Sequence, residues 1–391
     1  MRSRTVSLPS GPCPEGTLRA AATAEGRDPD LVLGFLPPDE QLPGTLRTLA
    51  ATWPESLRFG CEADTQFADA AVTRSGSLQL FWFELPGHGA TVEVVCGTRD
   101  EPPDEAAVAA LARGLAQAGG ALLLADGVRF PAEDLLGRLA PCFSRPLPRL
   151  AGGLASQRDP RTSEGGRVFY QDEVLPAACL ALTFRGVSLR IKVVRGWDPA
   201  SPVYTVTRAA GTALYEINGE PAVDWYARFF TVDGTLAPLP ETAFRFPLIL
   251  EGPAAERQGV YRTMRSFDDP KGAVTFWGSL HTGDRVRLGM GNQVSLVRTA
   301  ADLSPGTPPD AAILYSCIGR EAVLGTMAGD ELAAIQGALG GASLSGFFTN
   351  GEIGPSDRGG LAFYNQTAIL VLLRELPEIP ELPKRSPEPR L

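Results

Sequence analysis

The chain has 391 residues, of which 45 are acidic and 36 are basic, so its formal net charge is −9. This length favours two domains or one large duplicated unit. A net-acidic chain argues against a nucleic-acid-binding protein and against electrostatic docking on anionic membranes, because both need a basic surface. Only two histidines, His88 and His281, are present, which excludes a histidine-rich metal centre and leaves any Ser-His-Asp triad with one of these two.

Both ends of the chain lack a periodic apolar pattern. Residues 1–29 are rich in Pro, Gly, Arg and small residues, and residues 377–391 contain five prolines. We therefore expect a disordered tail at each end, the second of polyproline type. Residues 1–10 lack the apolar core of a signal peptide, and no apolar run approaches the ~20 residues that span a bilayer. We expect a soluble, cytoplasmic protein without membrane contacts.

A strand–helix–strand pattern that ends in a glycine-rich turn occurs three times in the body of the chain. The first copy begins at Leu31 and has a helical pattern from Leu46 to Trp53. The second begins at Ala121 and the third at Ala311. These copies predict an α/β fold with duplicated strand–helix–strand units and mixed sheets. The second strands of the units should carry equivalent glycines: Gly60, Gly153 and Gly346.

Further segments with strand patterns separate these units. We expect strands at 79–85, 91–96, 187–193, 273–277 and 294–297. Helices are predicted over 104–119 and after the turn at Asn218-Gly219, where Pro221 stands in the first helical turn. We place a domain boundary at this turn, which gives an N-terminal domain over 30–219 and a C-terminal domain over 220–376.

The six cysteines do not form a C-x-x-C pair. A structural zinc site or a thioredoxin-like motif is therefore not expected. Six cysteines are also too few for a disulfide scaffold in a chain of this length. We interpret them as free thiols in a reducing compartment.

Several motifs, taken in their order and spacing, resemble the FIST family. The C-terminal motifs are SCIGR at 316–320, GFFTNGEIGP at 346–355 and YNQTAILVLL at 364–373. The central motifs are GGLASQ at 152–157, RGWDP at 195–199, VTRA at 206–209 and LYEINGEPAVDWY at 214–226. The resemblance covers about residues 30–373. It implies an N-terminal and a C-terminal FIST domain that pack together and stand without an output domain.

The resemblance also implies a function. FIST proteins are intracellular sensor modules of signal transduction that are thought to bind small ligands, with amino acids the usual suggestion. One subset of the family consists of haem-binding nitric oxide sensors. Because this chain has no output domain of its own, the resemblance implies a separate partner, such as a kinase or a cyclic-nucleotide enzyme.

The C-terminal motifs supply the candidate ligand site. Two predicted strands end there in glycine-containing turns, and ligands of α/β sheets bind beyond the carboxyl ends of strands. Arg320 is suited to an anionic group and Glu352 to an ammonium group, which would fit an amino acid; alternatively, the two charges pair with each other as framework. The predicted ligand-binding residues are Cys317, Gly319, Arg320, Gly346, Phe347, Thr349, Gly351, Glu352, Asn365 and Thr367.

Alternative functions have less support in the sequence. The G-x-S-x-G, G-x-x-x-x-G-K-[ST] and H-E-x-x-H motifs are absent, so we expect no enzyme; the alternative is chemistry at Cys317, whose motif lacks a histidine base. His88 and His281 lie in predicted turns, where we expect solvated side chains rather than haem ligands. We therefore expect no cofactor, with haem on a cysteine or tyrosine as an alternative. A protein-interaction scaffold without a ligand is the third interpretation.

Overall fold

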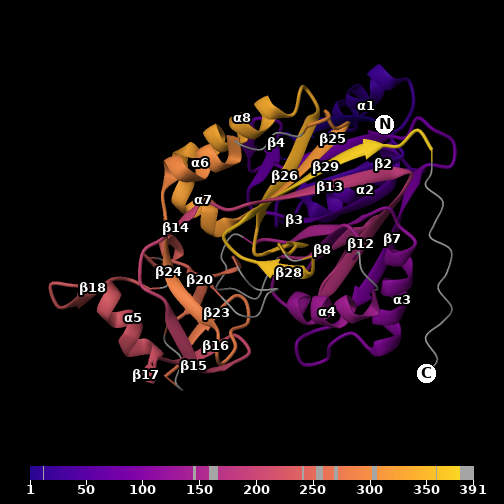
Figure 1. The fold of residues 1–391 in the computed structure, drawn as a ribbon. Coiled ribbons are helices and arrows are strands. Elements are labelled where there is room, and N and C mark those ends of the chain that lie inside the picture. Colours follow the sequence, from indigo (N-terminus) through magenta and orange to yellow (C-terminus); the bar gives the residue numbers. More distant parts are fainter. Residues whose placement is uncertain are drawn as a thin grey trace.

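The computed structural model describes residues 1–11, 13–143, 147–157, 166–239, 242–251, 259–267, 272–301, 306–357 and 359–378. Figure 1 shows groups of strands with helices around them and one group, with α5, that projects from the rest. The predicted α/β fold with mixed sheets is confirmed. Most of the predicted proline-rich tail, from residue 379 on, lies outside the described residues. Across the described part of the chain, no helix is long and apolar enough to cross a membrane.

Three parallel strand pairs form the centre of the fold. Each pair is joined by one or two helices, and the strands of all three pairs run in the same order and direction, so the predicted duplication is confirmed. The pairs are β2 (Leu31–Leu36) and β3 (Leu57–Glu62) with helix α2 (Leu42–Thr52), β8 (Ala121–Ala125) and β9 (Leu150–Leu154) with α4 (Ala132–Leu139), and β25 (Ala311–Cys317) and β26 (Ser343–Thr349) with α7 (Ile318–Leu324) and α8 (Ala328–Ala338).

Each parallel pair lies in a six-stranded sheet whose other strands follow one common arrangement. On one side of the pair are two antiparallel strands, and on the other side is a β-hairpin. The first sheet has the order β1 (Arg2–Ser7), β6 (Ser77–Trp82), β2, β3, β10 (Val168–Tyr170), β11 (Glu173–Leu175). The second has β7 (Gly89–Cys96), β12 (Ala178–Arg185), β8, β9, β27 (Glu352–Pro355), β28 (Leu361–Tyr364), and the third has β13 (Val187–Val194), β29 (Ala368–Glu375), β25, β26, β4 (Gln66–Ala68), β5 (Ala71–Thr73).

The hairpins are exchanged among the units. The hairpin β4–β5, which follows β3, completes the third sheet, and β10–β11, which follows β9, completes the first. The hairpin β27–β28, which follows β26, completes the second. Every unit therefore supplies a hairpin to another unit, and the N-terminal and C-terminal halves of the chain are interleaved in these sheets.

Glycines occupy equivalent places in the second strands, but one of the three predictions is wrong. A Cβ atom at Gly60, Gly152 or Gly346 would lie 2.0, 2.0 or 1.9 Å from the carbonyl oxygen of the paired residue on the neighbouring parallel strand. Each of these glycines also pairs with a large apolar residue of the exchanged hairpin: Phe169, Ile353 and Phe67. The equivalent of Gly60 is thus Gly152, not Gly153. The sequence offered two adjacent glycines, and only the register of the strands distinguishes them.

The three sheets share one apolar core. Buried side chains of all three sheets meet in a single cluster, in which the rings of Phe35 and Phe347 lie 4.8 Å apart and Tyr315 packs edge-on against Phe347. The opposite face of each sheet is covered by helices: α1 (Glu15–Ala22) and α2 on the first, α3 (Glu105–Ala116) and α4 on the second, and α6 (Gln293–Ala301), α7 and α8 on the third. The helices therefore lie outside a core that the sheets enclose.

The N-terminal segment is ordered, contrary to the prediction of a disordered tail over 1–29. Strand β1 pairs with β6 along all of its length, and Leu18 of α1 is fully buried. The sequence of β1 is polar except for Val6, which is its only large apolar side chain. Such an edge strand gives little apolar signal, because its partner strand supplies the buried residues.

The fourth sheet is inserted into the third unit between β13 and α6. It carries helix α5 (Ala222–Phe230), and a small hairpin of β18 (Thr231–Val232) and β19 (Thr235–Leu236) follows that helix. The predicted strand over 294–297 is wrong, since these residues belong to α6; a four-residue apolar run does not distinguish a strand from a helix. The strands of this sheet are β14 (Trp197–Pro199), β15 (Tyr204–Ala210), β16 (Ala213–Ile217), β17 (Glu220–Pro221), β20 (Leu248–Leu250), β21 (Tyr261–Arg262), β22 (Met264–Ser266), β23 (Val274–Phe276) and β24 (Arg285–Gly291).

Candidate functional site

The ten predicted ligand-binding residues are all buried; Gly346 and Phe347 lie within β26, where Phe347 faces the central core, and the others lie around the carboxyl ends of β25 and β26. Cys317 ends β25, Thr349 ends β26, Glu352 begins β27, and Thr367 directly precedes β29. Hydrogen bonds bring these four side chains together, as described below. The motifs that lie far apart in the sequence therefore do meet at one place, the end of the third parallel pair.

Glu352 lies at the centre of this cluster. The Thr349 hydroxyl donates to its Oε1 at 2.6 Å, and the Thr367 hydroxyl and amide donate to its Oε2 at 2.8 and 3.2 Å. Burial raises the pKa of Glu352 to about 7, although the hydrogen bonds from the threonines and Cys317 act in the opposite direction. No cation pairs with this carboxyl group among the residues that the structure describes. It is a buried acid that neutral groups already satisfy.

The thiol of Cys317 is a second ionisable group beside Glu352. Burial, reinforced by the negative charge of Glu352, raises the pKa of Cys317 well above its ordinary value. A nucleophilic cysteine needs the opposite shift, towards the thiolate. The surroundings of Cys317 therefore disfavour covalent chemistry at this thiol. All six cysteines are free, as expected.

Arg320 is bound to Glu331 of α8, so the alternative in which Arg320 pairs with Glu352 as framework is wrong in its partner. Both side chains of the Arg320–Glu331 ion pair are buried, and Arg320 also donates to the carbonyl oxygen of Arg195 at 3.5 Å. The reason is local: α7 begins directly after Cys317, so Arg320 lies in the first helical turn and faces the following helix. The guanidinium group is already engaged by the framework.

The segment from Asn365 to Thr367 is equally well packed. Asn365 accepts a hydrogen bond from the Thr263 amide at 3.4 Å and donates to the Tyr364 carbonyl oxygen at 3.0 Å. Gln366 has a left-handed backbone with φ of 61° and places its side chain over Gly319, where a Cβ atom would lie 2.3 Å from its Nε2. Gly319 thus makes room for Gln366, which lies in the motif at 364–373 but was not among the predicted site residues.

The two histidines differ from each other. His281 is exposed, but the side chain of His88 is only 2% exposed, so the expectation that it is solvated is wrong. Its Nδ1 lies 3.0 Å from Glu375 Oε1, and its ring packs where Gly186 leaves space. The pocket beside His88 is also lined by Asp30, Glu55 and Gln171. The carboxylates of Asp30 and Glu55 do not suit the apolar faces of a haem group, although the same pocket also has apolar lining residues, and an exposed His281 does not suit a haem group either.

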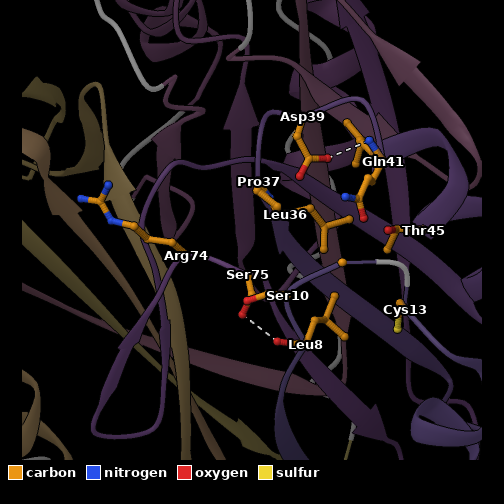
Figure 2. A pocket seen from close by; sticks show the side chains of 12 residues that line it. Leu8, Ser10, Cys13, Leu36, Pro37, Asp39, Gln41, Thr45, Arg74 and Ser75 are labelled. Atoms are coloured by element: carbon orange, nitrogen blue, oxygen red, sulfur yellow. Dashed lines mark hydrogen bonds between the residues drawn. The ribbon is translucent and has the colours of Figure 1, made fainter.

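An open pocket lies at the carboxyl end of β2, before α2, and we call it the β2–α2 pocket (Figure 2). Its volume is about 130 Å³. Three segments line it: residues 8–11 together with Cys13, residues 36–45, and the turn at Arg74 and Ser75. The buried part of the lining is apolar and consists of Leu8, Cys13, Leu36 and Leu42.

Polar side chains surround this apolar floor. Asp39 Oδ1 accepts a hydrogen bond from the Gln41 amide at 2.8 Å, and the Ser75 hydroxyl donates to the Leu8 carbonyl oxygen at 2.6 Å. Within the described ranges, the side chains of Ser10, Gln41 and Thr45 have no hydrogen-bond partner. Figure 2 shows Gln41 and Thr45 on one side of the pocket and the guanidinium group of Arg74 directed away from it. This pocket thus contains free polar groups, whereas the Glu352 cluster contains satisfied ones.

The β2–α2 pocket corresponds to the predicted site by its position in the repeat. Both lie where the first strand of a parallel pair meets its helix, the place where α/β sheets bind ligands. In the third unit α7 starts directly after β25, and the Cys317, Gly319 and Arg320 residues at this place are buried. In the first unit residues 37–41 separate β2 from α2, and this connection leaves the pocket open. Applying the strand-end rule to Leu31–Leu36 and the following Pro37-Pro38-Asp39 would have indicated it.

Comparison with known proteins identifies the family. The model of the FIST N domain matches residues 30–220, and that of the FIST C domain matches residues 222–355. The chain belongs to the FIST family. The change from one FIST domain to the other falls at β17, within the fourth sheet. The β2–α2 pocket lies mostly in the FIST N region, and the Glu352 cluster lies mostly in the FIST C region.

The relatives of this FIST protein extend the family assignment without adding a function. It is 27% identical over 249 residues to "Uncharacterized protein Rv0628c" of Mycobacterium tuberculosis. The aligned segment covers 60% of this chain and 63% of the relative. It is 29% identical over 248 residues to "Uncharacterized protein Mb0898c" of Mycobacterium bovis. Here the aligned segment covers 60% of this chain and 62% of the relative. The chain thus spans less than two thirds of these relatives. FIST domains are associated with sensing in signal transduction.

Proposed function

We propose that this FIST protein is a signal-transduction input module that binds a small polar metabolite in the β2–α2 pocket. The observation that carries the proposal is the set of unpartnered polar side chains, Ser10, Gln41 and Thr45, around an apolar floor. Convergent polar groups over an apolar surface are characteristic of small-molecule sites. In the Glu352 cluster, by contrast, Arg320 and Glu352 are already engaged by protein groups. The assignment of those ten residues to a ligand site stays a prediction.

The chemistry of the pocket suits an amino acid or a similar zwitterion. Asp39 uses Oδ1 to hold the turn, and its exposed carboxylate is suited to a ligand ammonium group. In the first turn of α2, the Leu42 amide donates to the Asp39 carbonyl oxygen at 3.3 Å and Pro43 has no N–H group, so the partial positive charge of the helix start is what favours a carboxylate. The hydroxyl and amide groups of Thr45 and Gln41 lie beside that turn. A zwitterion would therefore find one complementary charge at each end.

The proposed activity is binding, not catalysis. Cys317 is the only candidate nucleophile that the motifs suggest, and burial favours its protonated form. Output then depends on a separate protein, such as a kinase or a cyclic-nucleotide enzyme. Ligand binding could change the structure of two sheets, because the turn at Arg74 and Ser75 that lines the pocket connects β5 of the third sheet with β6 of the first.

The proposal is tested by thermal unfolding of the full chain with a panel of the twenty amino acids. We expect at least one of them to raise the midpoint of wild type in a concentration-dependent manner. Asp39→Asn keeps the oxygen that holds the turn but removes the charge, and should abolish this shift. Glu40→Gln removes the adjacent exposed charge, which does not line the pocket, and should retain the shift. Equal shifts in both variants, or none in wild type, would refute the site.

A further inference from the structure

A second pocket, which we call the junction pocket, lies between the first and second units. Its volume is about 370 Å³. Asp30 and Leu57 contribute from the amino ends of β2 and β3, and Gly89 and Ala90 contribute from the start of β7. The β2–α2 pocket lies at the carboxyl end of β2. The two pockets are therefore at opposite ends of the same parallel pair.

His88 lines the junction pocket with a ring that Glu375 holds in place. Its Nδ1 lies 3.0 Å from Glu375 Oε1, and the same carboxylate accepts hydrogen bonds from the amides of Glu84 and Leu85 at 3.1 and 3.2 Å. Glu375 has no proton to give, so this contact assigns the hydrogen to Nδ1 of His88. In the neutral ring Nε2 then carries a lone pair. Nε2 has no hydrogen-bond partner within the described part of the chain, but it lies against Gly186, which does not line the pocket.

Gln171 adds a hydrogen-bond acceptor. It occupies the turn between β10 and β11 with a left-handed φ of 56°, and its amide donates to the Arg58 carbonyl oxygen at 2.8 Å. Its side-chain Oε1 is buried and accepts no hydrogen bond from the described residues. A buried acceptor without a donor is costly, so a ligand N–H group at this place would be favourable. The backbone strain and the unsatisfied oxygen lie at the same residue.

Carboxylates complete the polar part of the lining. Glu55 is exposed and forms no ion pair with the described residues. Asp30 is engaged by the Arg27 guanidinium at 2.9 Å and by the Phe83 amide at 2.7 Å. The Nη2 group of Arg27 donates a hydrogen bond to the Phe83 carbonyl oxygen at 2.8 Å. Glu55 is thus the carboxylate available to a ligand, and its charge is negative.

The remaining wall is apolar. Leu57, Phe83 and Leu85 line the pocket from the first unit, and Ala90 lines it from the second. We propose that the junction pocket binds a primary amine in its ammonium form, with an alkyl or aryl group against this wall. The ammonium group donates to Glu55 and to Gln171 Oε1, which are both acceptors. An anion would meet no free donor of positive charge on this lining.

The test uses phenethylamine as the probe, with 2-phenylethanol as its uncharged analogue and 3-phenylpropionate as its anionic analogue. Titration of the full wild-type chain, followed by ligand-observed NMR, should show saturable binding of the amine. The alcohol should bind at least fivefold more weakly, and the acid should not bind. Binding of the alcohol or the acid as tight as that of the amine would overturn the proposal, and so would the absence of saturable amine binding.

Variants locate the amine. Glu55→Gln removes the free charge at an exposed position and should weaken amine binding about five- to tenfold. Gln171→Asn shortens the acceptor with a residue that tolerates the left-handed backbone and should weaken it at least threefold. The matched control is Glu173→Gln, an exposed carboxylate on the same hairpin outside the pocket, which should leave binding unchanged. Equal affinities of wild type and Glu55→Gln would overturn the assignment, while Asp39→Asn, which tests the other pocket, should have no effect here.

Discussion

Replacing Arg320 with alanine should destabilise the protein strongly. Arg320 is fully buried, and its partner Glu331 is 1% exposed, so the substitution leaves a carboxylate in the core without a counter-charge. Breaking a buried ion pair from one side costs about 3–5 kcal/mol of the free energy of unfolding. The hydrogen bond to the Arg195 carbonyl oxygen is lost as well. Urea unfolding, followed by circular dichroism and tryptophan fluorescence, measures the difference from wild type.

Two controls separate the buried charge from other effects of the substitution. Arg19→Ala breaks an exposed pair with Glu15 and should change the free energy of unfolding by no more than about 0.5 kcal/mol. The double variant Arg320→Met, Glu331→Leu removes both charges and should recover most of the stability that Arg320→Ala loses, since apolar side chains of similar size replace the pair. A loss for Arg320→Ala as small as that for Arg19→Ala would refute the reasoning.

Two further predictions concern the framework. Gly152→Ala should lower the free energy of unfolding by more than about 2 kcal/mol, because its Cβ would lie 2.0 Å from a backbone oxygen. Gly153→Ala should lower it less, since the nearest neighbour of its Cβ is the Thr349 methyl group. Urea unfolding of both variants gives the order, and the reverse order would contradict the assigned register. Glu352 keeps its proton up to about pH 7 when folded but ionises near pH 4.3 when unfolded, so the wild type should lose about 3 kcal/mol relative to Glu352→Gln as the pH rises from 4 to 8. A stability difference between these two proteins that does not change with pH would show that Glu352 titrates normally.

The sequence predicted the parts of the fold that have strong local signals. The apolar runs that begin at Leu31, Ala121 and Ala311 identified three units, because a buried parallel strand is apolar on both faces. The exchange of hairpins was not predictable in this way, since β4 and β10 have three residues each and their partners lie in other units. Strand β1 was missed because its edge position tolerates arginines.

The site was predictable to a similar extent. The strand-end rule brought Cys317, Thr349 and Glu352 together correctly. It did not show that Glu331, from the next helix, holds Arg320, because side-chain directions decide that contact. The β2–α2 pocket depends on the length of one connection and on three segments that are distant in the sequence. That its polar side chains lack hydrogen-bond partners can be recognised only from the three-dimensional structure, which shows the groups around them.

Native mass spectrometry of the full chain tests the central claim most directly. The wild type, incubated with the amino acid that gives the largest thermal shift, should carry one bound molecule, and Glu40→Gln should carry it too. Asp39→Asn, which loses the carboxylate of the β2–α2 pocket, should show only the mass of the free chain. Retention of the ligand by Asp39→Asn, or a free chain alone in the wild type, would contradict ligand binding at this place.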